Sequence, residues 1–149
     1  MTQEYLKRLC SRLEKTFQAA GMESDLGVKL EELREGMVRL SLATAEKHGN
    51  VYGIVHGGIL ASLCDIVMAT ACVTLKKRIV TLDMHISYIK NAPIGSTLTA
   101  VGEVVHNGRT IVRTSGRIYH GEALLALAQA SYYAKGDGMQ TDFLPEASV

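Results

Sequence analysis

The chain carries almost no net charge. Its 16 Lys and Arg residues nearly balance its 15 Asp and Glu residues, which leaves a formal net charge of +1. A protein without a strong field has no long-range attraction for nucleic acid or for an anionic membrane surface, so we expect neither as a partner. Any recognition of phosphate groups must therefore depend on local clusters of cations.

Cysteines are few, and their number is odd. Cys10, Cys64 and Cys72 form no Cys-x-x-Cys pair, and no histidine stands near them at the spacing of metal ligands. This pattern predicts free thiols in a reducing compartment and no metal site. The opening residues Met1 to Tyr5 also lack the apolar stretch of a signal peptide, so we expect a cytoplasmic protein.

No internal repeat and no clear linker divides the sequence, which favours a single domain over residues 1–149. Apolar residues at helical spacing predict an amphipathic helix within residues 1–20. These residues are Leu6, Leu9, Leu13 and Phe17. Glu35-Gly36 separates two alternating apolar segments and predicts a hairpin. From Gly136 on, the composition predicts a loosely ordered tail over residues 136–149.

A single acid, Asp65, stands inside an otherwise apolar run from Ile59 to Val73. A helix that is apolar all round belongs in a core, and the three cations at 76–78 suit its solvated C-terminal end. Alternating residues over 80–88, 96–106, 109–119 and 124–134 predict strands, with the apolar positions 80, 82, 84, 86 and 88 on one face. Because an antiparallel sheet must bury one face, the sequence predicts an α+β fold with a curved sheet around residues 58–76.

Three segments carry a resemblance to a known family. They are Asn50-x-x-Gly53-x-x-His56-Gly57-Gly58 followed by Ala61-Ser62-Leu63-x-Asp65, then Val80-Thr81-Leu82-Asp83-Met84-x-Ile86-x-Tyr88 with Asn91-Ala92-Pro93, and finally Gly95-x-x-Leu98-x-Ala100. Over roughly residues 25–135 the chain resembles the acyl-CoA thioesterases of the phenylacetic-acid-degradation type, the group that includes the human thioesterase superfamily member 2. The resemblance implies a hot-dog fold, with an antiparallel sheet wrapped around a central helix, and hydrolysis of an acyl-CoA thioester.

The chemistry of these residues suits thioester hydrolysis. The carbonyl oxygen of a thioester gains negative charge during attack, and backbone N–H groups at a helix N-terminus, here at Gly57 and Gly58, stabilise such charge. Asp65 can act as nucleophile or as general base, and both routes require its ionised form. Such a role would explain the acid in the apolar run, because a buried carboxylate without partners is costly.

Further roles are implied by the resemblance alone. It implies that Asn50 and Thr81 orient the water or the substrate carbonyl, and that His56 has a supporting role rather than that of the base. It also implies that two segments contact coenzyme A. Their residues are Lys90, Asn91, Asn107, Gly108, Arg109 and Thr110. Coenzyme A would arrive as part of the substrate, so we expect no separate cofactor.

The spacing of Gly57 and Asp65 bears on assembly. At 1.5 Å per residue they lie about 12 Å apart along the helix axis, which one thioester group does not comfortably span. The resemblance implies a homodimer with a shared active site, in which Gly57 of one subunit faces Asp65 of the other. It further implies a homotetramer.

Three alternatives stay open. Asp65 could be a structural acid that accepts hydrogen bonds from hydroxyls in the core. The chain could be an acyl-CoA hydratase or dehydratase, although neither an Asp-x-Asn-x-x-His run nor a His-x-x-Pro-Gly run stands near the helix. It could also be a non-catalytic hot-dog domain that senses acyl-CoA, although the presence of Asp65 is an argument against that. We interpret the remaining histidines as exposed; they are His48, His85, His106 and His120.

Overall fold

A computed structural model of the chain describes residues 2–137. The helices are α1 (Gln3–Gln18), α2 (Met22–Leu26), the short 3-10 helix η1 (Glu46–His48) and α3 (Gly57–Thr74). The strands are β1 (Val28–Arg34), β2 (Met37–Ala43), β3 (Lys77–Tyr88), β4 (Thr97–Asn107), β5 (Ile111–His120) and β6 (Ala123–Asp137). The predicted N-terminal helix, hairpin and central helix are confirmed, whereas α2 was not anticipated. Residues 138–149, which hold most of the predicted tail, lie outside the described residues.

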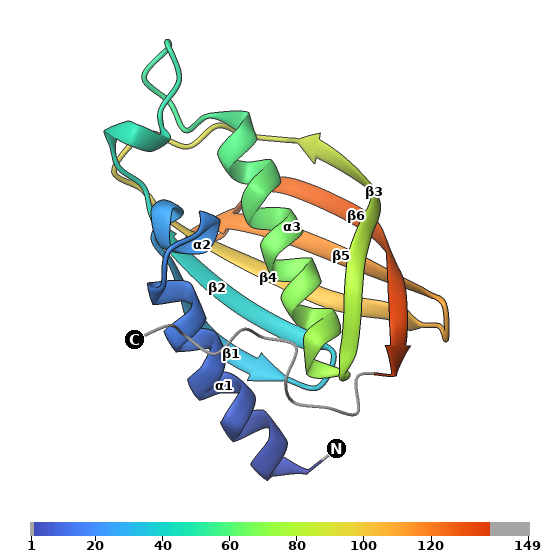
Figure 1. Cartoon of the computed structure of the whole chain (residues 1–149). Coiled ribbons are helices and arrows are strands. Elements are labelled where there is room, and N and C mark those ends of the chain that lie inside the picture. The colour runs from blue at the N-terminus through green and yellow to red at the C-terminus, as the bar shows by residue number, and fades with distance from the viewer. Residues whose placement is uncertain (1, 138–149) are drawn as a thin grey trace.

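All six strands form one antiparallel sheet in the order β1-β2-β4-β5-β6-β3. β1 and β2 form the predicted hairpin, and β4, β5 and β6 form a meander. β3 follows α3 in the chain but pairs with β6, so β1 and β3 are the two edges of the sheet. The sheet curves around α3, which lies across one of its faces (Figure 1). This α+β arrangement is the one that the sequence predicted.

The core lies between α3 and the inner face of the sheet. The buried apolar residues of α3 are Leu60, Leu63, Cys64, Val67, Met68, Ala71 and Cys72. β4 approaches the helix backbone closely because position 102 is glycine: a Cβ on Gly102 would lie 2.5 Å from the carbonyl oxygen of Val67. Four alanines supply small inner side chains on β6, at positions 126, 128, 130 and 134. The helix can therefore sit close to the sheet.

The inner and outer faces of β3 differ from the prediction. The pairing with β6 shifts between Thr81 and Asp83, so this part of β3 contains a β-bulge that interrupts the alternation of side chains. As a result Val80 and Leu82, which were predicted on the inner face, are exposed, and Thr81 reaches α3 instead. The sequence pattern could not show the bulge, because the residues still alternate in polarity.

The cationic segment at 76–78 also differs from the prediction. α3 ends at Thr74, and Lys77 is the first residue of β3 rather than part of a solvated helix end. Lys77 is buried, and its ammonium nitrogen lies 3.4 Å from the carbonyl oxygen of Gly108. At the other end of the sheet, β6 continues to Asp137, three residues beyond the predicted strand.

By length and composition α3 could also cross a membrane, with a mean hydropathy of 1.7 over 18 residues, and it is the one such helix in the described part of the chain. The core helix of a globular domain passes the same test, and half of α3 is buried within the fold.

Candidate active site

One backbone donor at the N-terminus of α3 has no protein partner among the described residues. The Nδ1 atom of His56, the N-cap residue, accepts a hydrogen bond of 2.8 Å from the N–H of Gly58. The carbonyl oxygen of His56 accepts from the next two N–H groups of the helix. Within residues 2–137, the N–H of Gly57 donates to no protein atom. The predicted pair of donors is therefore reduced to Gly57, because the histidine cap occupies Gly58.

Tyr88 holds this helix end against the sheet. Its hydroxyl donates to the carbonyl oxygen of Gly57 over 3.0 Å, from the last residue of β3. A Cβ on Gly57 would lie 3.3 Å from the Tyr88 ring, so glycine allows this close approach. The prediction did not single out Tyr88 by role, although it stands in the second motif segment. Its alternation with the apolar residues of β3 suggested only packing.

Asp65 lies two turns further along α3 and is only partly buried. Its Oδ1 atom accepts two hydrogen bonds, at 2.9 Å from the hydroxyl of Tyr132 and at 3.2 Å from the hydroxyl of Thr81. Its Oδ2 atom accepts no hydrogen bond from any residue that the structure describes. One carboxylate oxygen is thus held and the other remains available to a substrate or a water molecule.

Thr81 and Tyr132 reach Asp65 from neighbouring strands. The two residues are paired across β3 and β6, so both project toward α3. The structure brings the predicted site residue Thr81 to Asp65, although the sequence placed it on the face opposite the apolar stripe. Tyr132 was missed altogether. The available signal was a large side chain with a polar tip in a strand of inward alanines, since a buried tyrosine hydroxyl usually has a partner.

The electrostatic environment keeps the neighbouring groups neutral. Burial, and next the charge of Asp65, raise the pKa of Tyr132 above its ordinary value, so the phenol stays protonated and can only act as a donor to the carboxylate. Burial, with a smaller contribution from Asp65, also raises the pKa of Cys64 to about 12. Because a thiol attacks only as thiolate, Cys64 is not a nucleophile despite standing beside Asp65.

Asn50 stabilises the loop that leads into α3. Its Oδ1 atom accepts from the N–H groups of Tyr52 and Ile54, at 2.9 and 3.3 Å. Gly53 closes this turn at a φ of 74° and donates to the carbonyl oxygen of Asn50. Within one protomer no described hydrogen bond joins Asn50 to Gly57 or Asp65. Its predicted role in orienting water or substrate stays a prediction, and only its Nδ2 group is left for it.

His48 corrects the interpretation of the histidines. It is buried, its Nδ1 accepts from the N–H of Ala45 at 2.8 Å, and its Nε2 lies 2.9 Å from the carbonyl oxygen of Leu26. Its own carbonyl oxygen accepts from the N–H of His56. The residue therefore connects α2 to the entry of α3. His85, His106 and His120 are exposed as predicted.

The two predicted coenzyme A segments lie at opposite ends of one protomer. Lys90 and Asn91 are exposed just beyond the C-terminal end of β3, where the N–H of Lys90 bonds to the carbonyl oxygen of Leu125. The turn 107–110 lies beside Lys77, at the N-terminal end of β3. At about 3.3 Å per residue these ends are about 40 Å apart, so a single protomer does not bring them together.

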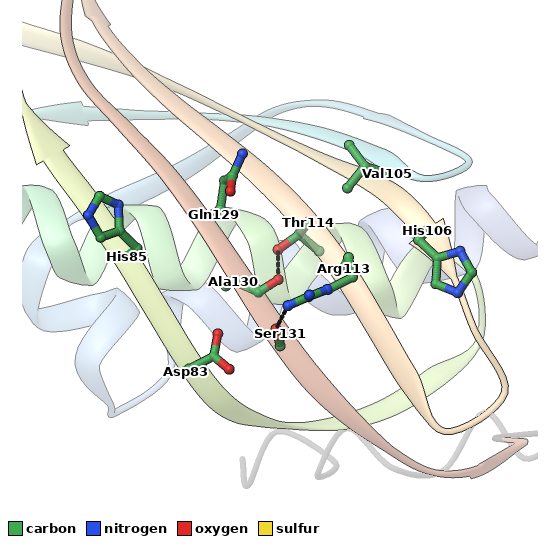
Figure 2. Close-up of a pocket in the computed structure, with 9 residues that line it drawn as sticks. All are labelled: Asp83, His85, Val105, His106, Arg113, Thr114, Gln129, Ala130 and Ser131. Atoms are coloured by element: carbon green, nitrogen blue, oxygen red, sulfur yellow. Dashed lines mark hydrogen bonds between the residues drawn. The ribbon is translucent and has the colours of Figure 1, made fainter.

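A separate hollow of about 420 Å³ lies on the outer face of the sheet, away from α3. Figure 2 shows Asp83 and His85 on β3, and Arg113 on β5 reaching toward Ser131 on β6. Arg113 donates to the Ser131 hydroxyl over 2.5 Å. This hollow holds no residue of the Gly57 and Asp65 site. Elsewhere too, no group of three or more metal-ligating side chains occurs among residues 2–137.

Known proteins are similar to this chain in sequence and in fold. The Thioesterase superfamily matches residues 52–126. Human acyl-coenzyme A thioesterase 13 is 32% identical over 101 residues, which cover 66% of this chain and 72% of that protein. A hypothetical thioesterase protein from Streptococcus pneumoniae, solved with coenzyme A, is 31% identical with a TM-score of 0.72, over 74% of this chain and 87% of that one. Two further structures of it are single mutants: one replaces an aspartate by alanine and the other replaces a threonine by alanine. The two replaced residues are 16 positions apart.

The E. coli PaaI protein from the phenylacetic acid degradation operon shares the fold, with a TM-score of 0.81 and 22% identity over 89% of this chain and 96% of that one. The fold is thus a hot-dog fold, as the sequence predicted. The chain belongs to the thioesterase superfamily and is a thioester hydrolase.

Proposed function

We propose that this protein hydrolyses acyl-CoA thioesters to a free acid and coenzyme A. The observation that carries the proposal is a pair of groups on α3 that have no hydrogen-bond partner among the described residues: the N–H of Gly57 and the Oδ2 atom of Asp65. One can stabilise an oxyanion and the other can attack or take up a proton. The names of the human relative and of the coenzyme A-bound Streptococcus pneumoniae structure support an acyl-CoA substrate.

The reaction follows from these two groups. If Asp65 is the general base, it takes a proton from water, and the oxygen of that water attacks the thioester carbon. The C–S bond then breaks, and the leaving coenzyme A thiolate takes the proton from Asp65, which returns to its ionised form. If Asp65 is the nucleophile, its carboxylate displaces coenzyme A and forms an acid anhydride, which water then hydrolyses. On either route the Gly57 N–H stabilises the charge on the carbonyl oxygen. Water is the second substrate, and the reaction requires no separate cofactor.

A shared site in a homodimer is part of the proposal. β3 is a long edge strand with exposed apolar side chains, among them Leu82 with 54% of its surface accessible. Unpaired edges of this kind readily pair with another chain, and two-fold symmetry would pair two β3 strands antiparallel. The Tyr88 end of one subunit, which holds Gly57, would then lie along the partner strand that carries Thr81 and faces Asp65.

The same pairing would unite the coenzyme A segments. Antiparallel β3 strands place the C-terminal end of one strand beside the N-terminal end of the other. Lys90 and Asn91 of one subunit would therefore approach the turn 107–110 of the other, where Arg109 adds a cation for the phosphates. We further propose that two such dimers form a homotetramer, which light scattering of the purified protein would test.

Asp65 and Thr81 are supported together as site residues. They are 16 positions apart, as are the aspartate and the threonine replaced in the Streptococcus pneumoniae mutants. Asn50 and His56 keep their proposed roles in orienting the substrate and supporting the helix end. We also propose a cytoplasmic location, which the three free thiols support.

The alternatives make different demands on Asp65. A hydratase would pair its acid with a histidine, whereas the described side-chain partners of Asp65 are two hydroxyls. A structural acid would also accept from hydroxyls, so the activity of an Asp65 variant is what separates it from a catalytic acid. An acyl-CoA sensor would bind substrate without turning it over.

The test is release of free thiol from phenylacetyl-, benzoyl-, short-chain and long-chain acyl-CoA by the wild type and by Asp65→Asn. The variant keeps the size of the side chain but can neither attack nor take up a proton. We expect turnover to fall at least about a hundredfold while the oligomer is kept. Tight acyl-CoA binding without turnover by the wild type would instead indicate the sensor and make Asp65 structural.

A further inference from the structure

We propose that Tyr132 is a positioning residue for Asp65: its buried hydroxyl holds Oδ1, together with Thr81, and so assigns Oδ2 as the oxygen that reacts. The inference rests on the proposed thioesterase function and adds a residue to it. It is carried by the 2.9 Å hydrogen bond from Tyr132 to Oδ1 and by the complete burial of the tyrosine side chain.

The first step is the rigidity of Tyr132. Its side chain has no accessible surface, and it projects from the middle of the pairing between β3 and β6. Inner alanines flank it on the same strand at positions 130 and 134. A ring packed in this way cannot change rotamer without opening the core, so the hydroxyl stays at one place.

The second step is what the hydroxyl contacts. It lies 2.9 Å from Oδ1 of Asp65 and 3.2 Å from the backbone carbonyl oxygen of the same residue. The fixed Tyr132 hydroxyl therefore contacts both the carboxylate of Asp65 and the helix backbone that bears it. The Thr81 hydroxyl adds a second donor to Oδ1 at 3.2 Å, from an exposed residue beside the β3 bulge.

The third step is the direction of the hydrogen bond. Because the buried phenol remains protonated, it donates to Asp65 and does not compete for its proton. A hydrogen bond to the ionised form of an acid favours that form, and both proposed routes use the ionised form. Oδ1 accepts two hydrogen bonds, and among the described residues no donor contacts Oδ2, so Oδ2 is the oxygen left for a substrate or a water molecule.

The decisive variant is Tyr132→Phe, which keeps the ring and removes only the hydroxyl. Since hydrogen bonds to charged groups are among the stronger ones, we expect kcat to fall by about 10-fold to 100-fold with little change in KM. We also expect the acid limb of the rate–pH profile to move to higher pH. Tyr133→Phe is the matched control, since Tyr133 is the next residue, lies on the outer face and is 43% exposed.

A second variant tests the same point without removing a buried group. Tyr132→3-fluorotyrosine keeps the ring and the hydroxyl but makes the phenol a stronger donor, so the acid limb should move to lower pH. A purely structural tyrosine would move neither limb. If the wild type and Tyr133→Phe turn over acyl-CoA while both Tyr132 variants keep the wild-type kcat and pH profile, the inference is wrong and the proposed function stands. If the wild type hydrolyses no thioester, the proposed function and the inference about Tyr132 are both wrong.

Discussion

At the scale of single residues, the start of α3 uses an unusual N-cap. A histidine ring nitrogen takes the role that a Ser, Thr, Asp or Asn oxygen usually has, and it occupies the Gly58 N–H. The neighbouring Gly57 N–H is left as the sole free donor of the first turn in the described structure. An acceptor placed there by a substrate would complete the cap. Because only one N–H group is involved, a single substitution at Gly57 can test its role.

Gly57→Pro removes that N–H with little demand on the backbone. Proline is favoured at the first helical position, and His56 at φ −64° and ψ 136° already has the conformation preferred before proline. If the N–H stabilises the oxyanion, kcat for acyl-CoA hydrolysis should fall by about 10²–10³-fold, the usual loss for one such donor. Steady-state kinetics on a substrate accepted by the wild type would measure this.

Gly57→Ala is the control for that change. It places a Cβ 3.3 Å from the Tyr88 ring but keeps the N–H. Tyr88 is exposed and can shift, so we expect a much smaller loss of kcat. Equal losses in the two variants would mean that the space beside Tyr88 matters and the donor does not.

At the scale of elements, the position of α3 depends on two glycines in the sheet. Gly102 of β4 lies under the helix backbone between Val67 and Met68, whereas Gly116 of β5 lies under the flexible Met68 side chain. A methyl group at position 102 would push against the backbone of α3. A methyl group at position 116 would push only against the movable thioether of Met68. The glycines thus set how closely the helix bearing Asp65 approaches the strands bearing Thr81 and Tyr132.

Gly102→Ala should therefore destabilise the fold by about 1–3 kcal/mol, because its Cβ would lie 2.5 Å from the Val67 carbonyl oxygen. Gly116→Ala is the matched comparison, with its Cβ 3.0 Å from Met68 Cγ, and it should cost less. Urea unfolding of the two variants and the wild type would give the free energies. A larger cost at position 116 than at 102 would contradict this account of helix placement.

At the scale of the whole molecule, the site is incomplete in one chain under the proposed function. Gly57 is about 12 Å from Asp65 along α3, and the predicted coenzyme A segments lie at opposite ends of β3. If two chains pair along their β3 edges, Gly57 and one coenzyme A segment of one chain approach Asp65 and the other segment of its partner. The long exposed edge and the divided site are then two aspects of one assembly.

A mixed dimer tests this assembly. Dimers of Asp65→Asn alone or Gly57→Pro alone should be inactive, but a dimer with one chain of each kind would contain one site with both native residues. Coexpression with random pairing should restore about a quarter of wild-type activity. The two variants, purified separately and then mixed, serve as the comparison. Persistent inactivity of verified mixed dimers would place each whole site within a single chain.

Many of the helices and strands, and the family, could be predicted from the sequence alone. The period of the apolar residues gave α1, the β1–β2 hairpin and α3, and the motif around Asn50, His56 and Asp65 pointed to the hot-dog family. These are local patterns, and local patterns depend on the spacing of side chains along a helix or a strand. The amphipathic residues Leu9, Leu13 and Phe17 are buried for this reason.

The sequence could not show which groups meet. It placed Thr81 on the wrong face because the bulge in β3 depends on pairing with β6, and it placed His48 on the surface because its burial depends on α2 and Leu26. It missed Tyr132, which is 67 residues from Asp65. The sequence thus determined the elements, the family and the acid, since these follow from local periodicity and motif. Only the tertiary structure decided which hydroxyls hold that acid and which N–H stays free, because such contacts depend on strand register and packing between distant segments.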